Sequence, residues 1–328
     1  MKKDFVCPKC RGALVTLDGG VKKCAAGHSY DRARAGYYNL LLGSSGGDHG
    51  DNKMMVEARR AFLAGGYYSP LAERVAALVA EHALTTVEQG KPATKPDQTI
   101  SSDKSSAPSD QPAPYEKTAT PSEGRLTPSG AVGRGAYIPT VLDCGCGEGY
   151  YTARVCSALD GALGADGYSM LAFDISRDAA KLAARAARSA SVAVASCYSI
   201  PVADGSVDIA MNVFSPLAPD EIHRALHQSG VYIVAYPGED HLYDLKAAIY
   251  DNPYKNQPQG RAPDGFSLKS RERVAYEIDL GTNAEITALF SMTPYAYRTG
   301  KKERERLEKI EKLRTRVEFF IDIYEKQG

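Results

Sequence analysis

The sequence lacks a surplus of either charge, and this sets a first limit on its function. Its 40 basic and 40 acidic side chains give a formal net charge of zero, so any binding of nucleic acid must come from a local basic patch. No apolar run approaches the roughly 20 residues of a membrane helix, and the N-terminal stretch MKKDFVCPKC has no apolar core of a signal peptide. We therefore expect a cytoplasmic protein that does not bind a membrane.

Cysteine is scarce and unevenly placed. The seven cysteines are an odd number, and three of them lie near the N-terminus at metal-ligand spacing, which argues against a disulfide framework. A C-x2-C pair is followed, after thirteen residues, by C-x3-H. Three thiolates and one imidazole complete the tetrahedral shell of a structural Zn²⁺. We predict that the ligands are Cys7, Cys10, Cys24 and His28, and that zinc supplies most of the folding free energy of this small segment.

Composition divides the chain into four segments. Residues 1–43 form the zinc-binding segment, whose basic side chains predict recognition of RNA. Residues 50–88 are expected to be connecting helices, because apolar residues recur with helical spacing. Residues 89–136 are rich in Ser, Thr, Pro, Lys and Asp with almost no large apolar residue, so we expect a disordered insertion. Residues 137–328 alternate strand and helix signals as an open α/β sheet does.

The fourth segment predicts a seven-stranded sheet. The expected strands are 140–144, 169–174, 191–196, 207–213, 230–236, 273–280 and 316–324, and the expected helices are 148–160, 177–189, 219–228, 240–251 and 282–291. A seventh strand inserted beside the sixth favours a methyltransferase sheet over a dehydrogenase sheet. The predicted fold class is therefore α/β, a Rossmann-like methyltransferase domain with a small N-terminal zinc-binding domain.

The first strand of this sheet runs into a glycine-rich turn, Asp143-Cys144-Gly145-Cys146-Gly147-Glu148-Gly149. Glycines let the backbone approach a ligand, and the N–H groups of the following helix face it. The turn lacks the Lys-Ser/Thr pair of a P-loop, and Glu148 suits a cationic or neutral ligand better than a pyrophosphate. Asp174 ends the next strand, where it would bind a ribose hydroxyl pair. S-adenosylmethionine is the predicted ligand, bound by Asp143, Gly145, Gly147, Glu148 and Asp174.

Two further residues are candidates for contact with a substrate. Asn212 and Phe214 follow the strand at 207–213, at the carboxyl edge where such sheets bind substrate. Asn212 is a candidate to hydrogen-bond a base edge, and Phe214 to stack on the base; the alternative, that both cap and pack the strand end, stays open. Arg59 and Arg60 are expected to meet RNA phosphate, with a salt-bridged helix face as the alternative.

The order of zinc knuckle, helices and methyltransferase sheet resembles the bacterial 23S ribosomal RNA guanine-N1 methyltransferases. The resemblance covers the whole chain except the insertion at 89–136. It is carried by Cys7-Pro8-x-Cys10, Tyr37-Tyr38-Asn39-Leu40-Leu41, Met54-Met55-x-x-Arg59-Arg60-Ala61-Phe62-Leu63, Gly66-Tyr67-Tyr68-x-Pro70, the glycine-rich turn, Pro237-Gly238-x-x-His241-Leu242 and Met292-Thr293-Pro294-Tyr295.

This resemblance implies methyl transfer from S-adenosylmethionine to N1 of a guanine in the hairpin loop of helix 35 of 23S rRNA. It implies the same four zinc ligands, and cofactor contacts at Tyr68, Gly147, Glu148 and His241. The family splits between two neighbouring target guanines, and both stay open. No residue stands out as a general base, although Asp240 and His241 are candidates.

Two other functions remain as alternatives. A methyltransferase of the same fold could act on another RNA or on a small molecule, although a small-molecule enzyme would have no need of the zinc knuckle. A non-catalytic, zinc-dependent RNA-binding protein would have no need of an intact 143–149 turn or of Asp174. The sequence is compatible with a homodimer.

Overall fold

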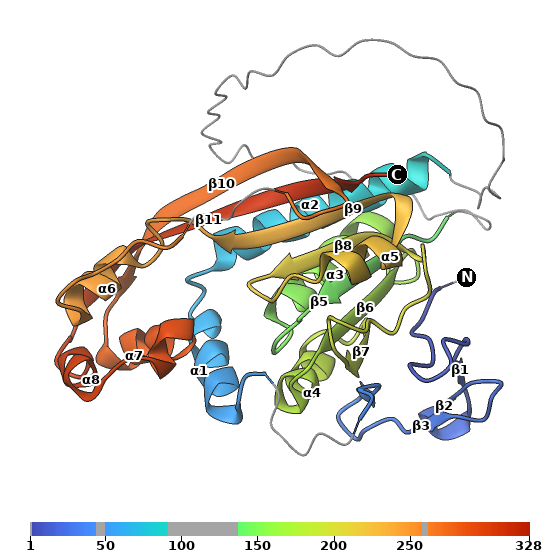
Figure 1. Ribbon diagram of the computed structural model, residues 1–328, viewed down its shortest axis with the longest axis horizontal. Helices are drawn as coiled ribbons and strands as arrows, with labels where there is room; N and C mark the ends of the chain where they lie inside the picture. Colours follow the sequence, from blue (N-terminus) through green and yellow to red (C-terminus); the bar gives the residue numbers. More distant parts are fainter. Residues whose placement is uncertain (1, 44–49, 91–136, 258–261) are drawn as a thin grey trace, which may run out of the picture.

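The computed structural model describes residues 2–43, 50–90, 137–257 and 262–328. Its centre is one large sheet with the strand order β10-β11-β9-β8-β5-β6-β7-β4 (Figure 1). The strands are β4 (Tyr38–Asn39), β5 (Thr140–Cys144), β6 (Ser169–Asp174), β7 (Ala190–Val194), β8 (Val207–Val213), β9 (Leu226–Pro237), β10 (Phe266–Leu280) and β11 (Leu313–Lys326). Strand β11 lies antiparallel between β9 and β10. The predicted fold class is thus confirmed, including the last strand inserted beside the sixth.

An eighth strand, β4, joins the seven that were predicted. Its two residues come from the N-terminal segment and pair in parallel with β7. Strand β10 begins at Phe266, before the predicted 273–280. The added part is an edge of the sheet with exposed side chains such as Lys269 and Arg271, so it lacks the alternation of apolar and polar residues that marks a half-buried strand.

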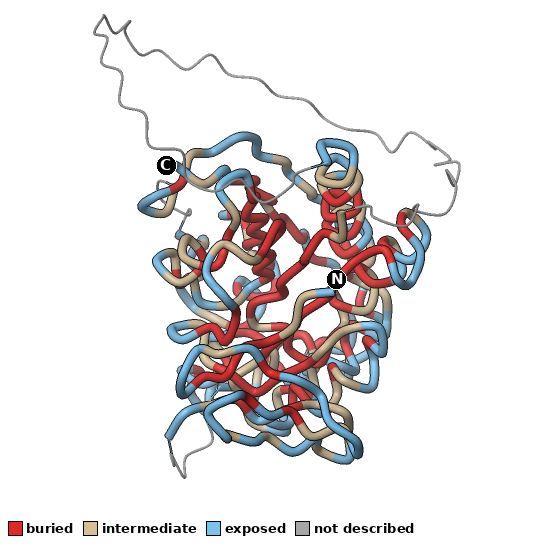
Figure 2. Tube along the Cα trace, turned by 90° about the vertical axis from the view of Figure 1, so that its right-hand side faces the viewer, coloured by how far each residue is buried: buried red, intermediate tan, exposed pale blue. Residues whose placement is uncertain are grey.

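Helices cover both faces of the sheet. They are α1 (Lys53–Ala64), α2 (Ser69–Glu88), α3 (Tyr150–Leu163), α4 (Arg177–Ala186), α5 (Pro219–Ala225), α6 (Tyr243–Ile249), α7 (Asn283–Ser291) and α8 (Lys301–Leu307). One core cluster joins α2, α3, α6 and α7 to one face of the sheet, and a second joins α5 and the N-terminal segment to the other face. Buried segments run through the middle of the molecule in Figure 2. Helix α6 begins later than the predicted 240–251, because Leu242 at its N-cap has a left-handed φ of 58°.

The N-terminal segment packs on the sheet as part of the same core. It contains the short antiparallel strands β1 (Val15–Thr16), β2 (Lys22–Lys23) and β3 (Ser29–Tyr30). Phe5 and Leu40 share a buried cluster with Leu171 and Ile200. Within the described ranges, no helix is long and apolar enough to cross a membrane. The insertion predicted to be disordered lies outside the described residues from 91 to 136.

Candidate functional site

The three glycines between β5 and α3 all have a positive φ, but their surroundings differ. A Cβ on Gly145 would lie 2.5 Å from the Cβ of Ser215, and one on Gly149 would lie 2.7 Å from the Cα of Ala183. These two glycines therefore let the loop pack against the protein itself. A Cβ on Gly147 would meet only a guanidinium nitrogen of Arg59, 3.6 Å away. A ligand can therefore come close to the backbone at Gly147.

The two predicted acids lie on different sides of this loop. Asp143 is 2% exposed and accepts a hydrogen bond from Thr152 Oγ1 at 2.6 Å. Burial raises the pKa of Asp143 to about 7, outweighing that hydrogen bond, so its carboxyl supports the loop from the protein interior. Asp174 accepts the backbone N–H of Gly147 at 2.9 Å and that of Ser176 at 2.8 Å. A carboxylate has about four lone-pair positions, which leaves capacity on Asp174 for ribose hydroxyls.

Glu148 is the best test of whether this loop fits S-adenosylmethionine. The residue is only 6% exposed, and its Oε2 has no hydrogen-bond partner among the described residues. Burial raises the pKa of Glu148, whereas the charge of Arg59 lowers it. An unpartnered, buried carboxylate oxygen beside the open side of Gly147 suits a ligand with an ammonium group. The residues present therefore fit this cofactor.

Arg59 lies beside the glycine-rich loop. Its guanidinium is ion-paired with Asp51 and lies next to Gly147. Burial alone lowers the pKa of Arg59, but the negative charges of Asp51 and Glu148 raise it by more, so the pKa lies above its usual value. The ion pair of Arg59 is what the salt-bridged alternative expects. The neighbouring Arg60 is exposed, and contact of either arginine with RNA phosphate stays a prediction.

Aromatic rings gather at the carboxyl edge of the sheet. Phe214 follows β8, is 43% exposed and has a left-handed φ of 59°, a conformation that carries strain for a bulky residue. Its ring centroid lies 6.4 Å from that of Tyr68, 6.2 Å from that of Tyr151 and 5.6 Å from that of Phe319. Neither Tyr151 nor Phe319 was predicted as a site residue, because each has the sequence pattern of an ordinary helix or strand residue.

Tyr68 and His241, which the resemblance assigns to the cofactor, contact each other. The Tyr68 hydroxyl lies 3.3 Å from Nε2 of His241, and the backbone N–H of Glu318 donates to Nδ1 at 3.3 Å. The neutral ring therefore carries its proton on Nε2 and donates it to Tyr68. Burial lowers the pKa of His241 to about 3, which makes it a poor base. Asp240, the other candidate base, forms an ion pair with Lys255 at 2.7 Å.

Asn212 is held by its own turn. The residue is 2% exposed; its Nδ2 donates to the carbonyl of Pro216 at 3.1 Å, and its Oδ1 accepts the N–H of Ser215 at 3.2 Å. These contacts fix the turn that carries Phe214. The side chain is thus engaged as the strand-capping alternative expects.

The four predicted zinc ligands converge at one place. Their ligand atoms all lie within 4.8 Å of one another, and the sulfur atoms of Cys10 and Cys24 are 3.6 Å apart. A tetrahedral site with Zn–S bonds of about 2.3 Å holds its sulfur atoms about 3.8 Å apart. Burial raises the pKa of Cys7, but hydrogen bonds from Tyr30 and from backbone N–H groups outweigh it and leave a pKa of about 6. The donor set and its spacing fit zinc.

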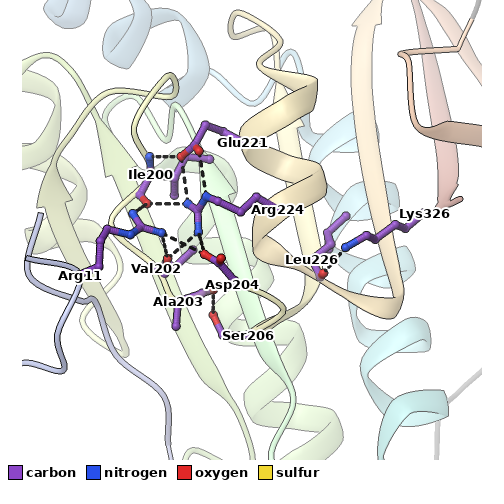
Figure 3. Close-up of polar contacts among 10 residues, drawn as sticks. All are labelled: Arg11, Ile200, Val202, Ala203, Asp204, Ser206, Glu221, Arg224, Leu226 and Lys326. Carbon is purple, nitrogen blue, oxygen red and sulfur yellow. Dashed lines mark hydrogen bonds and ion pairs between the residues drawn. The ribbon is translucent and has the colours of Figure 1, made fainter. Parts of the chain in front are cut away.

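Arg11 attaches this metal site to the sheet domain. Its guanidinium donates to the carbonyl oxygens of Ile200 at 3.0 Å and Val202 at 2.8 Å, and to Asp204 at 3.3 Å (Figure 3). Arg224 of α5 donates to the same three residues from the other side. The carbonyl groups of Ile200 and Val202 are therefore held between two arginines, one of which follows the ligand Cys10 directly.

Comparisons with known proteins agree with both parts of the site. Residues 141–230 match the family described as "Methyltransferase domain", and residues 5–42 match the family described as "RlmA, N-terminal". The 23S rRNA (guanine(748)-N(1))-methyltransferase of Streptomyces fradiae is 30% identical over 293 residues, which cover 87% of this chain and 84% of that protein. A Micromonospora griseorubida protein provisionally named a 23S rRNA (guanine-N(1)-)-methyltransferase is also 30% identical, with 89% and 86% covered. Among solved structures, the YcgJ protein of Bacillus subtilis matches 58% of this chain and 94% of its own at 13% identity, with a TM-score of 0.38.

Proposed function

Because the chain belongs to the 23S rRNA (guanine-N1)-methyltransferases, we propose that its target is one guanine in the hairpin loop of helix 35. The protein is an S-adenosylmethionine-dependent enzyme that methylates N1 of a guanine in 23S rRNA and binds zinc. The observation that carries this conclusion is that the whole chain is 30% identical to such an enzyme over most of both lengths. The same chain has a four-ligand metal cluster as well as the glycine-rich cofactor loop. We propose that it acts in the cytoplasm.

The chemistry places two demands on the chain's own residues. When bound, S-adenosylmethionine supplies an electrophilic methyl group, so the site must hold guanine N1 in line with it. N1 must also lose its proton as the methyl group arrives. His241 has a pKa of about 3 and Asp240 is paired with Lys255, so neither suits a general base. We infer that the proton leaves to water at the rim of the site, where Phe214 is 43% exposed.

We propose that Phe214 receives the target base. A base in an RNA hairpin must leave its stack to reach a buried methyl donor, and aromatic side chains provide the surface on which it stacks again. Phe214 is the exposed member of the aromatic group that includes Tyr68. In this proposal Asn212 acts by fixing the turn, and contributes to base binding through Phe214.

The zinc segment is proposed to bind the RNA backbone. Its basic side chains divide into two sets, because Arg11 holds the sheet domain and Lys22 is buried in an ion pair with Asp4. Lys9, Lys23 and Arg34 are exposed and are therefore among the side chains available for phosphate contacts. A local patch of this kind reconciles RNA binding with a net charge of zero.

The test is methyl transfer into a defined RNA. Unmodified helix 35 fragments are incubated with the protein and radiolabelled S-adenosylmethionine, and the modified position is mapped by primer extension, which stops at N1-methylated guanine because that edge no longer pairs. One stop at a loop guanine is expected. Incorporation without a stop in this hairpin would exclude the proposed target, and no incorporation into any rRNA fragment would favour the small-molecule or non-catalytic alternatives.

We also propose that the protein is a homodimer. The test is its mass in solution, measured by light scattering.

A further inference from the structure

The start of α3 carries two buried polar atoms without a partner. Among the described residues, Oε2 of Glu148 and the hydroxyl oxygen of Tyr151 make no hydrogen bond and are closed to solvent. Glu148 precedes the N-cap Gly149 and Tyr151 lies in the first turn of α3. Burial is the main cause of the raised pKa of Tyr151, and the two groups are close enough that the charge of Glu148 contributes to it. Unpartnered polar atoms in a protein interior are destabilising and rare. Two of them at one place indicate a ligand that satisfies both.

The helix start favours a negative group at this place. Helix α3 has 14 residues, its N-cap Gly149 supplies no side-chain hydrogen bond, and its first turn contains no acidic residue. The free N–H groups and the positive end of the helix dipole attract an anion. Burial raises the pKa of Tyr151 well above its usual value, so the hydroxyl keeps its proton and can donate it in a hydrogen bond. Glu148, in contrast, offers an acceptor.

The position of Tyr151 in the sheet indicates which end of the cofactor it meets. Strand β5 lies between β6, which ends in Asp174, and β8, which is followed by Phe214. The Tyr151 ring lies 6.2 Å from that of Phe214, on the β8 side of the glycine loop. A cofactor with its ribose at Asp174 that extends across the end of β5 brings its amino-acid end to Tyr151.

We propose that the Tyr151 hydroxyl donates a hydrogen bond to the α-carboxylate of S-adenosylmethionine, and that Oε2 of Glu148 accepts one from its α-ammonium group. The zwitterionic end of the cofactor then meets a donor and an acceptor three residues apart, and both unpartnered atoms are satisfied. The proposal rests on S-adenosylmethionine dependence alone and is independent of which guanine is methylated.

The experiment compares two ligands in the absence of RNA. S-adenosylhomocysteine has the amino-acid end, whereas 5′-methylthioadenosine keeps the adenosine and the sulfur but lacks that end. Calorimetry on the zinc-loaded full chain should show that Tyr151→Phe weakens binding of S-adenosylhomocysteine about ten- to a hundredfold, as expected for loss of a hydrogen bond to a charged group. Binding of 5′-methylthioadenosine should not change. The melting temperature of the free protein should stay the same or rise, because the variant removes an unpartnered hydroxyl.

Tyr150→Phe is the matched control. The Tyr150 hydroxyl lies 3.4 Å from Oγ of Ser69, so its loss should leave the affinity for both ligands unchanged. The proposal is overturned if Tyr151→Phe binds S-adenosylhomocysteine as tightly as the wild type, or if it weakens both ligands equally. A raised KM for RNA with unchanged S-adenosylhomocysteine affinity would also overturn it, by assigning Tyr151 to the base. Because the binding measurement contains no RNA, a wrong rRNA target would leave its result intact.

Discussion

Nε2 of His241 lies 3.3 Å from the Tyr68 hydroxyl, while Nδ1 of the same ring accepts the backbone N–H of Glu318. The second contact requires an unprotonated Nδ1, and burial lowers the pKa of His241 from 6.5 to about 3. The folded state therefore prefers the neutral ring more strongly than the unfolded state does. The resulting stability is complete above pH 6.5 and is lost as the pH falls from 6.5 toward 3.

A comparison with His241→Asn measures this contribution. Asparagine can still accept a hydrogen bond from the Glu318 N–H but does not titrate. The free energy of unfolding of the wild type, relative to that of the variant, should fall by up to about 1.4 kcal/mol for each pH unit below 6.5. Denaturant unfolding at a series of pH values gives the difference, and loss of zinc in acid affects both proteins alike. A difference that does not vary with pH would contradict the buried, neutral ring.

We expect alanine substitutions at Gly147 and Gly149 to have different effects, the first mainly on ligand binding and the second mainly on stability. Gly147→Ala places a left-handed alanine in the loop, at a cost of about 1–2 kcal/mol in stability, and its methyl group occupies the space open to a ligand. Gly149→Ala carries the same backbone cost and also overlaps Ala183. The first variant should fold and bind S-adenosylhomocysteine poorly; the second should lose more in melting temperature. Tight binding by Gly147→Ala would place the ligand elsewhere.

Asp174 is predicted to select the ribose. Its carboxylate would accept hydrogen bonds from both hydroxyls, so Asp174→Ala should weaken S-adenosylmethionine binding by about 1.5–3 kcal/mol, or about ten- to a hundredfold. A 2′-deoxyribose analogue should bind the wild type more weakly than the ribose form, and Asp174→Ala should lose most of that preference. Asp143→Asn is the control, because Asp143 faces Thr152 in the interior. An undiminished preference in Asp174→Ala would remove this acid from the ribose site.

The sequence could predict the parts of the fold that rest on local patterns. Strands β5 and β6 are short apolar runs that end in an acid or a glycine turn, and their predicted bounds agree with the structure. Strand β4 was missed because two residues, Tyr38 and Asn39, carry no periodic signal; their pairing with β7 depends on where the zinc segment packs. Helix α5 ends at Ala225, before the predicted 228, because β9 takes over at Leu226.

At the site, the chemistry of the residues was predictable, but their orientation was not. Asp174 and Glu148 were identified by their place after a strand and in a turn, and their roles toward the cofactor remain proposals. The placement of Arg59 against the glycine loop depends on its ion pair with Asp51 and on the packing of α1. The strand position of Phe319 gave no sign that its ring would lie 4.9 Å from that of Tyr68.

We expect the contacts between Arg11 and the sheet domain to slow the release of zinc. Cys10→Ser should lose the metal, whereas Arg11→Ala keeps all four ligands and loses the contacts to residues 200–204. Hydrogen bonds from a charged group contribute about 1.5–3 kcal/mol, and we expect the lower end of this range because the Arg11 side chain is 41% exposed. Zinc transfer to a chromogenic chelator should then be about tenfold faster than in the wild type.

Lys9→Ala is the control for this measurement, since Lys9 lies between two ligands but is exposed. It should release zinc at the wild-type rate. Equal rates for Arg11→Ala and the wild type would show that docking on residues 200–204 does not stabilise the metal site.

The enzyme should place its methyl group on N1 of guanine in 23S rRNA and on no other atom of the nucleoside. The direct measurement is mass spectrometry of nucleosides, after digestion of 23S rRNA that has been treated with the protein and S-adenosylmethionine. We expect 1-methylguanosine, separated by retention time from the N2-, N7- and 2′-O-methyl isomers of equal mass, and a much lower yield when Asp174→Ala replaces the wild type at limiting cofactor. A methylated nucleoside other than 1-methylguanosine as the sole product would show that guanine N1 is not the methylated atom.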